Sequence, residues 1–155
     1  MVWVTFYNDD SWRIGPLALN SNPQVSCIIL NWNGWRDTIA CLDALQNCTY
    51  PQFKVVVVDN GSTDDSITRI RSARPETLLL ESKINLGFAG GNNIGIRHAL
   101  ADGADYIWLL NNDTMPAPDA LSALVAKAVS DRRIGAVASI CYYADSPSTV
   151  QACAG

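Results

Sequence analysis

Short apolar runs alternate with helix-like patterns along most of the chain. Residues 25–30 and 53–58 are short, rich in β-formers and bounded by turn residues, as strands buried on both faces are. Between them, apolar residues recur every three or four positions, which predicts a helix that ends near Asn47. This apolar stripe consists of Trp35, Ile39, Leu42 and Leu45.

The alternation continues through the second half of the sequence. Further strands are predicted over residues 77–80, 106–110 and 134–142. Further helices are predicted from Ser62 to the residue before Pro75, from the glycine-rich segment 87–93 to Leu100, and from Pro118 to Asp131. The first of these helices is expected to be capped by the Ser62 hydroxyl and the Asp65 carboxylate. Strand–helix–strand units with such short connections are right-handed, so we expect an α/β fold with a mostly parallel sheet covered by helices.

The start of the chain lacks this order. Residues 1–24 show no sustained periodicity and finish in a turn-rich run, so we expect an irregular leader there and a folded domain over residues 25–155. The chain has 155 residues, of which 48% are hydrophobic and 17% charged. This length and composition suit one domain with a sizeable core and exclude disorder as the main state.

Charge and cysteine content exclude several classes of protein. The formal charge of −4 provides no basic surface for unspecific nucleic-acid binding. The five cysteines form no C-x-x-C pair, so neither a zinc cluster nor a redox dithiol is indicated. No segment approaches the about 20 apolar residues of a membrane span, and no export signal is visible. We therefore expect a cytoplasmic protein.

Polar clusters follow three of the predicted strands. They are Asn31-Trp32-Asn33-Gly34, Asp59-Asn60-Gly61-Ser62 and Asn111-Asn112-Asp113-Thr114. Asn, Asp and Gly are also ordinary turn formers, so any one cluster has a structural explanation. However, the carboxyl ends of parallel strands meet at one edge of the sheet, where such folds bind ligands. The set therefore favours a binding site at that edge.

Each cluster has a chemical use. Trp32 can lie along a planar base, while Asn31 and Asp59 provide the donors and acceptors that a pyrimidine edge or ribose needs. Asp113 and the amide oxygens beside it are hard ligands for Mg²⁺ or Mn²⁺, with a diphosphate supplying the rest. The glycines at 90 and 91 allow close approach of a phosphate to backbone, and the helix that follows directs free N–H groups at negative charge.

Competing sites have little support. The spacing of Gly87, Gly90, Gly91 and Gly95 is not G-x-G-x-x-G, and these residues do not follow the first strand, which argues against a dinucleotide-binding oxidoreductase. The one histidine, His98, lies in a predicted helix without a matched partner for a catalytic triad. The arginines at 69, 71 and 74 are expected to form a solvated helix face.

Four segments in order resemble the family 2 glycosyltransferases of GT-A fold. They are 25–33 (VSCIILNWN), 57–64 (VVDNGSTD), 85–93 (NLGFAGGNN) and 110–113 (LNND). Within that family they look most like the bacterial rhamnosyltransferase-like branch. The resemblance covers residues 25–155 and implies a Rossmann-like three-layer α/β/α sandwich, truncated before its acceptor-binding half.

The resemblance also implies roles for individual residues. Asn31, Trp32 and Asp59 would surround the nucleoside, and Gly87 and Asn92 would belong to the nucleotide-sugar site. The D-x-D motif is filled by Asn111, Asn112 and Asp113, with Asp113 as the ligand of Mg²⁺ or Mn²⁺. Two departures matter: Asn111 replaces the first carboxylate of that motif, and Asn92 stands where many members place an arginine near the diphosphate.

The function implied is an inverting glycosyltransferase of hexosyltransferase type. It would transfer a sugar, with rhamnose as one candidate, from a dTDP- or UDP-linked donor to a glycan or lipid-linked acceptor in cell-envelope polysaccharide synthesis. The general base and the acceptor site are expected beyond Gly155, so no catalytic residue is assigned in this chain. We expect the full-length protein to be cytoplasmic, peripheral to the inner face of the membrane, and prone to form homo-oligomers. The alternative is a nucleotide-sugar-binding module without catalysis of its own.

Overall fold

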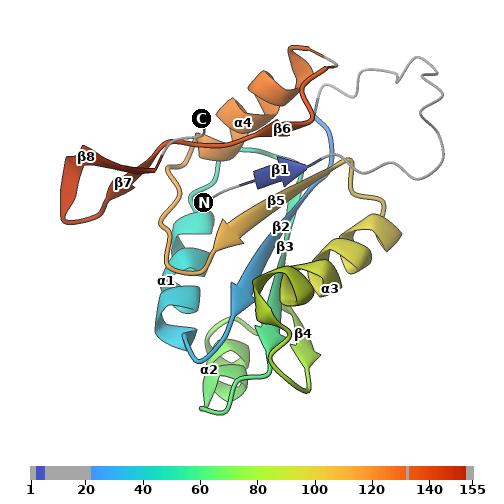
Figure 1. Ribbon diagram of the computed structural model, residues 1–155, viewed down its shortest axis with the longest axis vertical. Coiled ribbons are helices and arrows are strands. Elements are labelled where there is room, and N and C mark those ends of the chain that lie inside the picture. The colour runs from blue at the N-terminus through green and yellow to red at the C-terminus, as the bar shows by residue number, and fades with distance from the viewer. Residues whose placement is uncertain (1–2, 6–21, 132, 153–155) are drawn as a thin grey trace.

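The computed structural model describes residues 3–5, 22–131 and 133–152, and it has an α/β architecture (Figure 1). Its strands are β1 (Trp3–Thr5), β2 (Val25–Asn31), β3 (Phe53–Asn60), β4 (Leu78–Ser82), β5 (Tyr106–Asn111), β6 (Ala136–Val137), β7 (Cys141–Tyr143) and β8 (Ser146–Ala152). Its helices are α1 (Trp35–Leu45), α2 (Ser66–Ala73), α3 (Gly87–Ala101) and α4 (Ala120–Val129).

The main sheet has the strand order β4-β3-β2-β5-β1-β6. β2 lies at its centre, parallel to β3 and β5, while β1 runs antiparallel to β5 and β6. The chain winds from β2 to β4 in one direction and then crosses back to place β5 on the other side of β2. Strand order therefore reverses between β2 and β5, and their carboxyl ends form the edge where ligands of such folds bind.

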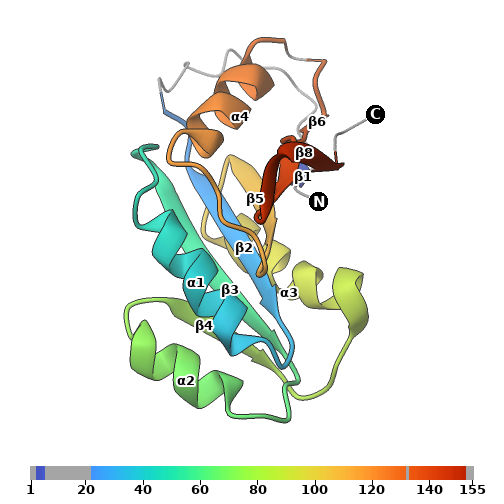
Figure 2. The ribbon, with the colours of Figure 1, turned by 90° about the vertical axis from the view of Figure 1, so that its left-hand side faces the viewer.

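Helices cover both faces of this sheet. α1, α2 and α4 contribute to the apolar cluster on one face, together with Cys27 and Ile29 of β2. α3 covers the other face through Ala99 and packs over Ile28. Figure 2 shows α1 and α2 in front of the sheet, with α3 behind it. The expected three-layer sandwich with a mostly parallel sheet is confirmed.

Strand periodicity decides where the polar side chains at the carboxyl edge go. Successive side chains of a strand point to opposite faces. Asn31 of β2 and Asp59 of β3 are register partners and continue the face covered by α1 and α2. Asn60, one residue later, continues the face covered by α3. One strand end therefore supplies polar groups to both sides of the sheet.

Several element boundaries differ from the prediction. Trp3–Thr5, within the expected irregular leader, forms β1 and joins the sheet, whereas residues 1–2 and 6–21 lie outside the described residues. The strand expected over 134–142 is divided into β6 and β7. β7 pairs with β8 in a separate two-stranded sheet. Short strands whose pairing is set by distant segments carry little periodic signal of their own.

The predicted cap of α2 is also wrong. The helix begins at Ser66, and the Asp64 carboxylate accepts the backbone N–H of Ser66 at 3.0 Å. The Ser62 hydroxyl is engaged elsewhere, because it donates to Asp59 at 2.6 Å. The Ser62 hydroxyl thus bonds the end of β3 and does not cap α2.

Candidate functional site

A buried amide–carboxylate pair joins the ends of β2 and β3. Asn31 Nδ2 donates to Asp59 Oδ1 at 2.7 Å. Ser62 strengthens the pair, since its hydroxyl donates to Asp59 Oδ1 at 2.6 Å and its backbone N–H donates to Oδ2 at 3.0 Å. Both Asn31 and Asp59 are 0% exposed. In this conformation they organise the carboxyl edge from beneath and do not form its open surface.

Thr38 of α1 extends this pair to β5. Its hydroxyl donates to Asn31 Oδ1 at 2.8 Å and accepts from Asn112 Nδ2 at 3.2 Å. Asn112 Nδ2 also approaches the Gly34 carbonyl at 3.4 Å. A continuous hydrogen-bonded chain therefore runs across the ends of β5, β2 and β3. We call this set, Asn112, Thr38, Asn31, Asp59 and Ser62, the edge network.

The edge network fixes the turn that carries Trp32. Asn33 has a positive φ of 52°, a conformation that Asn tolerates better than most residues. Its backbone N–H donates to the Ser62 hydroxyl at 2.9 Å, and its side-chain oxygen accepts the Thr63 N–H at 2.8 Å. Trp32 itself is 56% exposed. A rigid backbone thus presents an indole to solvent at the switch point of the sheet.

On the other face, Asn60 holds the connection into α3. Its amide nitrogen donates to Asn85 Oδ1 at 2.9 Å and to the Gly87 carbonyl at 3.1 Å, while its oxygen accepts the Leu86 N–H at 3.0 Å. Gly87 has a φ of 71° and a solvent-exposed position at the start of α3. The amino end of α3 is therefore fixed at the same edge as the edge network.

Part of the glycine-rich segment has a different role from the one predicted. It forms the first turns of α3, and Gly91 is buried against Leu30 and Asn60. At Gly95 an added Cβ would lie 2.6 Å from Ile28 Cγ2. The prediction that Gly91 allows a phosphate to approach the backbone is wrong, because its missing side chain allows α3 to approach the sheet.

Asn92 also lies on the packed side of α3. It is 4% exposed, and its amide nitrogen donates to the Phe88 carbonyl at 2.9 Å. Its side chain is therefore engaged within the helix. Its role in the nucleotide-sugar site stays a prediction.

Asp113 is the exposed carboxylate of the turn after β5. The preceding Asn111 is half-buried, and its carbonyl accepts the Thr114 hydroxyl at 2.6 Å and the Cys41 thiol at 3.8 Å. Within the described ranges, no three His, Cys, Asp or Glu side chains come together to hold a metal ion. A cation here would have Asp113 as its carboxylate ligand and would take further oxygens from amides and from the bound ligand.

Cys41 lies beneath this turn. The pKa of its thiol is raised to about 11 in total. Burial is the main cause, the negative charge of Asp113 adds to it, and the Thr114 hydroxyl acts in the opposite direction. A thiol with so high a pKa stays protonated at neutral pH, so it is a poor nucleophile. Cys41 therefore has a packing role.

The three arginines of α2 and its C-terminal end are paired. Arg69 donates to Asp65 at 2.7 Å, Arg71 pairs with Glu81, and Arg74 pairs with Asp43. The guanidinium of Arg69 also lies 5.4 Å from the centre of the Trp35 ring, and that of Arg36 lies 4.2 Å from it. The predicted solvated face is confirmed for Arg69 and Arg71, whereas the side chain of Arg74 is only 22% exposed.

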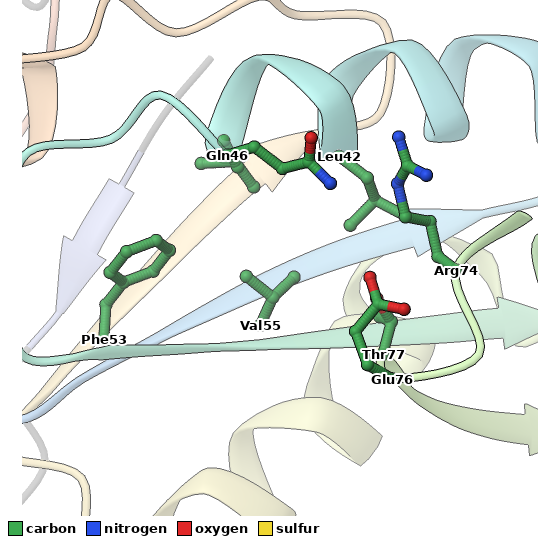
Figure 3. Close-up of a pocket in the computed structure, with 8 residues that line it drawn as sticks. Leu42, Gln46, Phe53, Val55, Arg74, Glu76 and Thr77 are labelled. Atoms are coloured by element: carbon green, nitrogen blue, oxygen red, sulfur yellow. The ribbon is translucent and has the colours of Figure 1, made fainter.

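A pocket of about 250 Å³ lies at the opposite end of β3. Figure 3 shows its lining from the end of α1, the start of β3 and the α2–β4 connection. The lining residues are Leu42, Leu45, Gln46, Phe53, Val55, Arg74, Glu76 and Thr77. The pocket lies at the start of β3, whereas the edge network contains Asp59, near the end of that strand. The pocket is therefore separate from the candidate site.

Sequence reasoning missed two members of the edge network. Thr38 was not singled out, although a hydroxyl on the buried side of a helix stripe indicates a specific partner. Ser62 was assigned to a helix cap. The hydrogen bonds of Thr38 reach residues 7 and 74 positions away, so no local pattern contains them. Ser62 bonds Asp59 three residues before it, but it also accepts the backbone N–H of Asn33 from 29 residues away.

Residues 26–151 match the family described as glycosyl transferase family 2, and the chain belongs to this family. The galactofuranosyltransferase GlfT1 of Mycolicibacterium smegmatis is 30% identical over 129 residues, which cover 82% of this chain and 42% of that protein. GlfT1 of Mycobacterium tuberculosis is 42% identical over 74 residues, 46% of this chain and 24% of that protein. The chain thus spans less than half the length of these curated relatives.

Solved structures support the same assignment. The mannosyltransferase PcManGT from Pyrobaculum calidifontis, in complex with GDP-Man and Mn²⁺, is similar with a TM-score of 0.62 at 28% identity. The match covers 71% of this chain and 33% of that one. Staphylococcus aureus TarS 1-349 in complex with UDP has a TM-score of 0.58 at 22% identity over 66% of this chain and 31% of that one, which shows the fold alone. The GT-A-like fold and the family 2 assignment are confirmed, and the rhamnosyltransferase-like branch stays a prediction.

Proposed function

We propose that this domain binds a nucleoside diphosphate sugar and, in the whole protein, transfers the sugar with inversion to a glycan or lipid-linked acceptor of the cell envelope. The donor nucleotide is UDP or dTDP. The edge network carries the proposal, because it links the turn bearing exposed Trp32 to the turn bearing exposed Asp113. A stacking surface and a carboxylate fixed at one edge suit the two ends of a nucleoside diphosphate.

A divalent cation, Mg²⁺ or Mn²⁺, fits the turn at 111–113 in part. Asp113 is exposed and free to provide one carboxylate oxygen. The Asn112 nitrogen is committed to Thr38 and Gly34, so the oxygen of that amide is left for a ligand. When bound, the cation supplies positive charge that stabilises the departing diphosphate. We assign Asp113 and the Asn112 oxygen to hold it, with phosphate oxygens completing the coordination.

The remaining roles follow from position. We assign Trp32 to the nucleoside base, and the amino end of α3, beginning at Gly87, to the negative charge of the diphosphate. Asn31 and Asp59 support the base-binding turn from beneath. Acceptor binding and removal of the acceptor proton are assigned to the part of the longer relatives that this chain does not cover.

No helix in the described part of the chain is long and apolar enough to cross a membrane. The location on the cytoplasmic face and the tendency to form homo-oligomers stay predictions. Two donor sugars are proposed. The resemblance favours rhamnose, whereas the relative GlfT1 is a galactofuranosyltransferase and suggests galactofuranose.

Titration calorimetry of the chain with UDP, dTDP and NAD⁺, each with and without Mn²⁺, tests the proposal. We expect UDP or dTDP to bind, with Mn²⁺ strengthening binding roughly fivefold or more. Asp113→Ala should lose the effect of Mn²⁺, because it removes the carboxylate ligand. Asp119→Ala is the matched control, since Asp119 is an exposed carboxylate that makes no capping bond at α4, and it should behave like the wild type.

Failure of the folded chain to bind any nucleotide would refute the donor site, and binding of NAD⁺ alone would refute the family-based function. Competition between dTDP-linked rhamnose and UDP-linked galactofuranose then identifies the sugar. Binding without transfer by the whole protein would favour the binding-module alternative.

A further inference from the structure

The direction of the hydrogen bonds in the edge network is fixed at each step. Asp59 is a carboxylate and only accepts, so the Asn31 amide nitrogen faces it and the Asn31 oxygen faces Thr38. Thr38 has one hydroxyl proton and donates it to that oxygen at 2.8 Å. The amide of Asn112 must then present its nitrogen to Thr38, as observed at 3.2 Å. The hydrogen bonds donated by Asn112, Thr38 and Asn31 therefore all run in one direction, towards the buried carboxylate of Asp59.

This direction determines what the metal-binding turn presents. Because the Asn112 nitrogen is held by Thr38, the oxygen of the same amide is left for another partner. That oxygen adjoins Asp113 in the sequence. The amide proposed as a cation ligand is therefore oriented by a group outside the turn that bears it.

Thr38 links the two halves of the site through its side chain, beside the longer contact of Asn112 Nδ2 with the Gly34 carbonyl at 3.4 Å. It is 0% exposed, and its hydroxyl joins Asn112, at the end of β5, to Asn31, at the end of β2. Hydrogen bonds that follow one another in a chain polarise each other. A cation bound to the Asn112 oxygen therefore makes the amide nitrogen of that residue a stronger donor. The effect strengthens the bonds that hold the nucleoside-binding turn.

We propose that Thr38 is a positioning residue that couples cation binding at Asp113 to nucleotide binding at the β2–β3 edge. The proposal rests on the proposed function, because it requires a nucleotide and a cation at this edge. A purely structural Thr38 would affect the stability of the fold and the affinity for each ligand separately. A coupling residue also changes how much one ligand strengthens the other.

The test is the ratio of the UDP dissociation constant without metal to that at saturating Mn²⁺, measured by calorimetry on the 155-residue chain. Saturation ensures that a weaker metal site alone does not lower the ratio. We expect Thr38→Val, which keeps the shape and removes the hydroxyl, to lower the ratio roughly fivefold or more. Thr38→Ser restores the hydroxyl and should keep the ratio within about twofold of the wild type.

Ser66→Ala is the matched control. Ser66 is 0% exposed at the start of α2, and its hydroxyl makes no hydrogen bond to any residue that the structure describes. Loss of this buried hydroxyl should leave the ratio unchanged. If Thr38→Val does not fold, Thr38→Ala removes the same hydroxyl without touching a proposed cation ligand and is expected to lower the ratio by a similar factor.

The outcomes separate the two proposals. A wild-type chain whose UDP binding depends on Mn²⁺, with the same ratio in Thr38→Val, overturns the role of Thr38 and leaves the proposed function standing. An equal fall of the ratio in Thr38→Ser and Thr38→Val also overturns the role of Thr38, since the hydroxyl would then not transmit the coupling. A folded wild-type chain that binds no nucleotide overturns both.

Discussion

Asn33 combines an unusual backbone conformation with two kinds of hydrogen bond. Its φ of 52° is costly for residues with ordinary side chains. Its side-chain oxygen accepts the backbone N–H groups of Thr63 and Asp64, which ties the turn after β2 to the turn after β3. The residue identity is therefore required twice, once for conformation and once for bonding.

Replacement of Asn33 should reveal both requirements. We expect Asn33→Ala to lower the free energy of unfolding by about 1–2 kcal/mol, because alanine is strained at positive φ and cannot accept the two bonds. Asn33→Asp keeps an acceptor oxygen and tolerance of this conformation, so it should stay within about 0.5 kcal/mol of the wild type. Urea unfolding measures both. Equal stability of the alanine variant and the wild type would show that the turn does not depend on this side chain.

Much of the candidate site could be predicted at the scale of residues. Asn31, Trp32, Asp59 and Asp113 stand at or just beyond the ends of strands whose apolar runs are plain in the sequence, and the structure brings these strand ends to one edge. The sequence pattern could not show which of these side chains are exposed to solvent. Asn31 and Asp59 are fully buried because strand alternation directs them under α1, and that face is decided by packing.

At the scale of elements, α3 shows why a glycine-rich segment is ambiguous. The same residues suit a phosphate-binding loop and a helix packed tightly on a sheet. The choice depends on Ile28, Leu30 and Val58, side chains of two distant strands that meet the glycine positions. A sequence window around residues 87–95 contains none of these partners.

Gly95→Ala tests this packing. An added Cβ would lie 2.6 Å from Ile28 Cγ2 and 3.1 Å from Val58 Cγ2, both in the packed core. We expect a loss of about 1–3 kcal/mol in the free energy of unfolding, despite the better helix propensity of alanine. Gly135→Ala, at a position where no described atom beyond its chain neighbours lies within 4 Å of the added Cβ, should be close to neutral. Thermal unfolding of the two variants decides between packing and flexibility as the role of Gly95.

At the scale of the whole molecule, buried thiols make the fold sensitive to alkaline pH. Burial raises the pKa of the Cys27 thiol well above 9.0 and that of Cys41 to about 11. In the unfolded chain these thiols lose their protons near their ordinary pKa, so above it the unfolded state binds fewer protons than the folded state. The stability that these buried, protonated thiols contribute is therefore fully present below pH 9 and is lost as the pH rises through their folded-state pKa values.

We expect the free energy of unfolding to fall by about 1.4 kcal/mol per pH unit for each of these thiols between pH 9 and 11. Buried Tyr50, whose pKa is also raised by burial, adds to the loss from pH 10 upwards. Urea titrations under reducing conditions measure the slope. Cys41→Ala should show a shallower slope than the wild type, and an equal slope in both would contradict the assignment to Cys41.

The position of β1 has a consequence for the order of assembly. β1 lies between β5 and β6, and Trp3 pairs with Leu109, a partner made about a hundred residues later. During synthesis, β2, β3 and β4 can pair with one another as they emerge, whereas β1 has no place to dock until β5 is in the sheet. Until then the outer side of β5 is an open strand edge. β1 is made before β2, β3, β4 and β5 but is incorporated after them, and the nascent chain depends on it to close that edge against other chains.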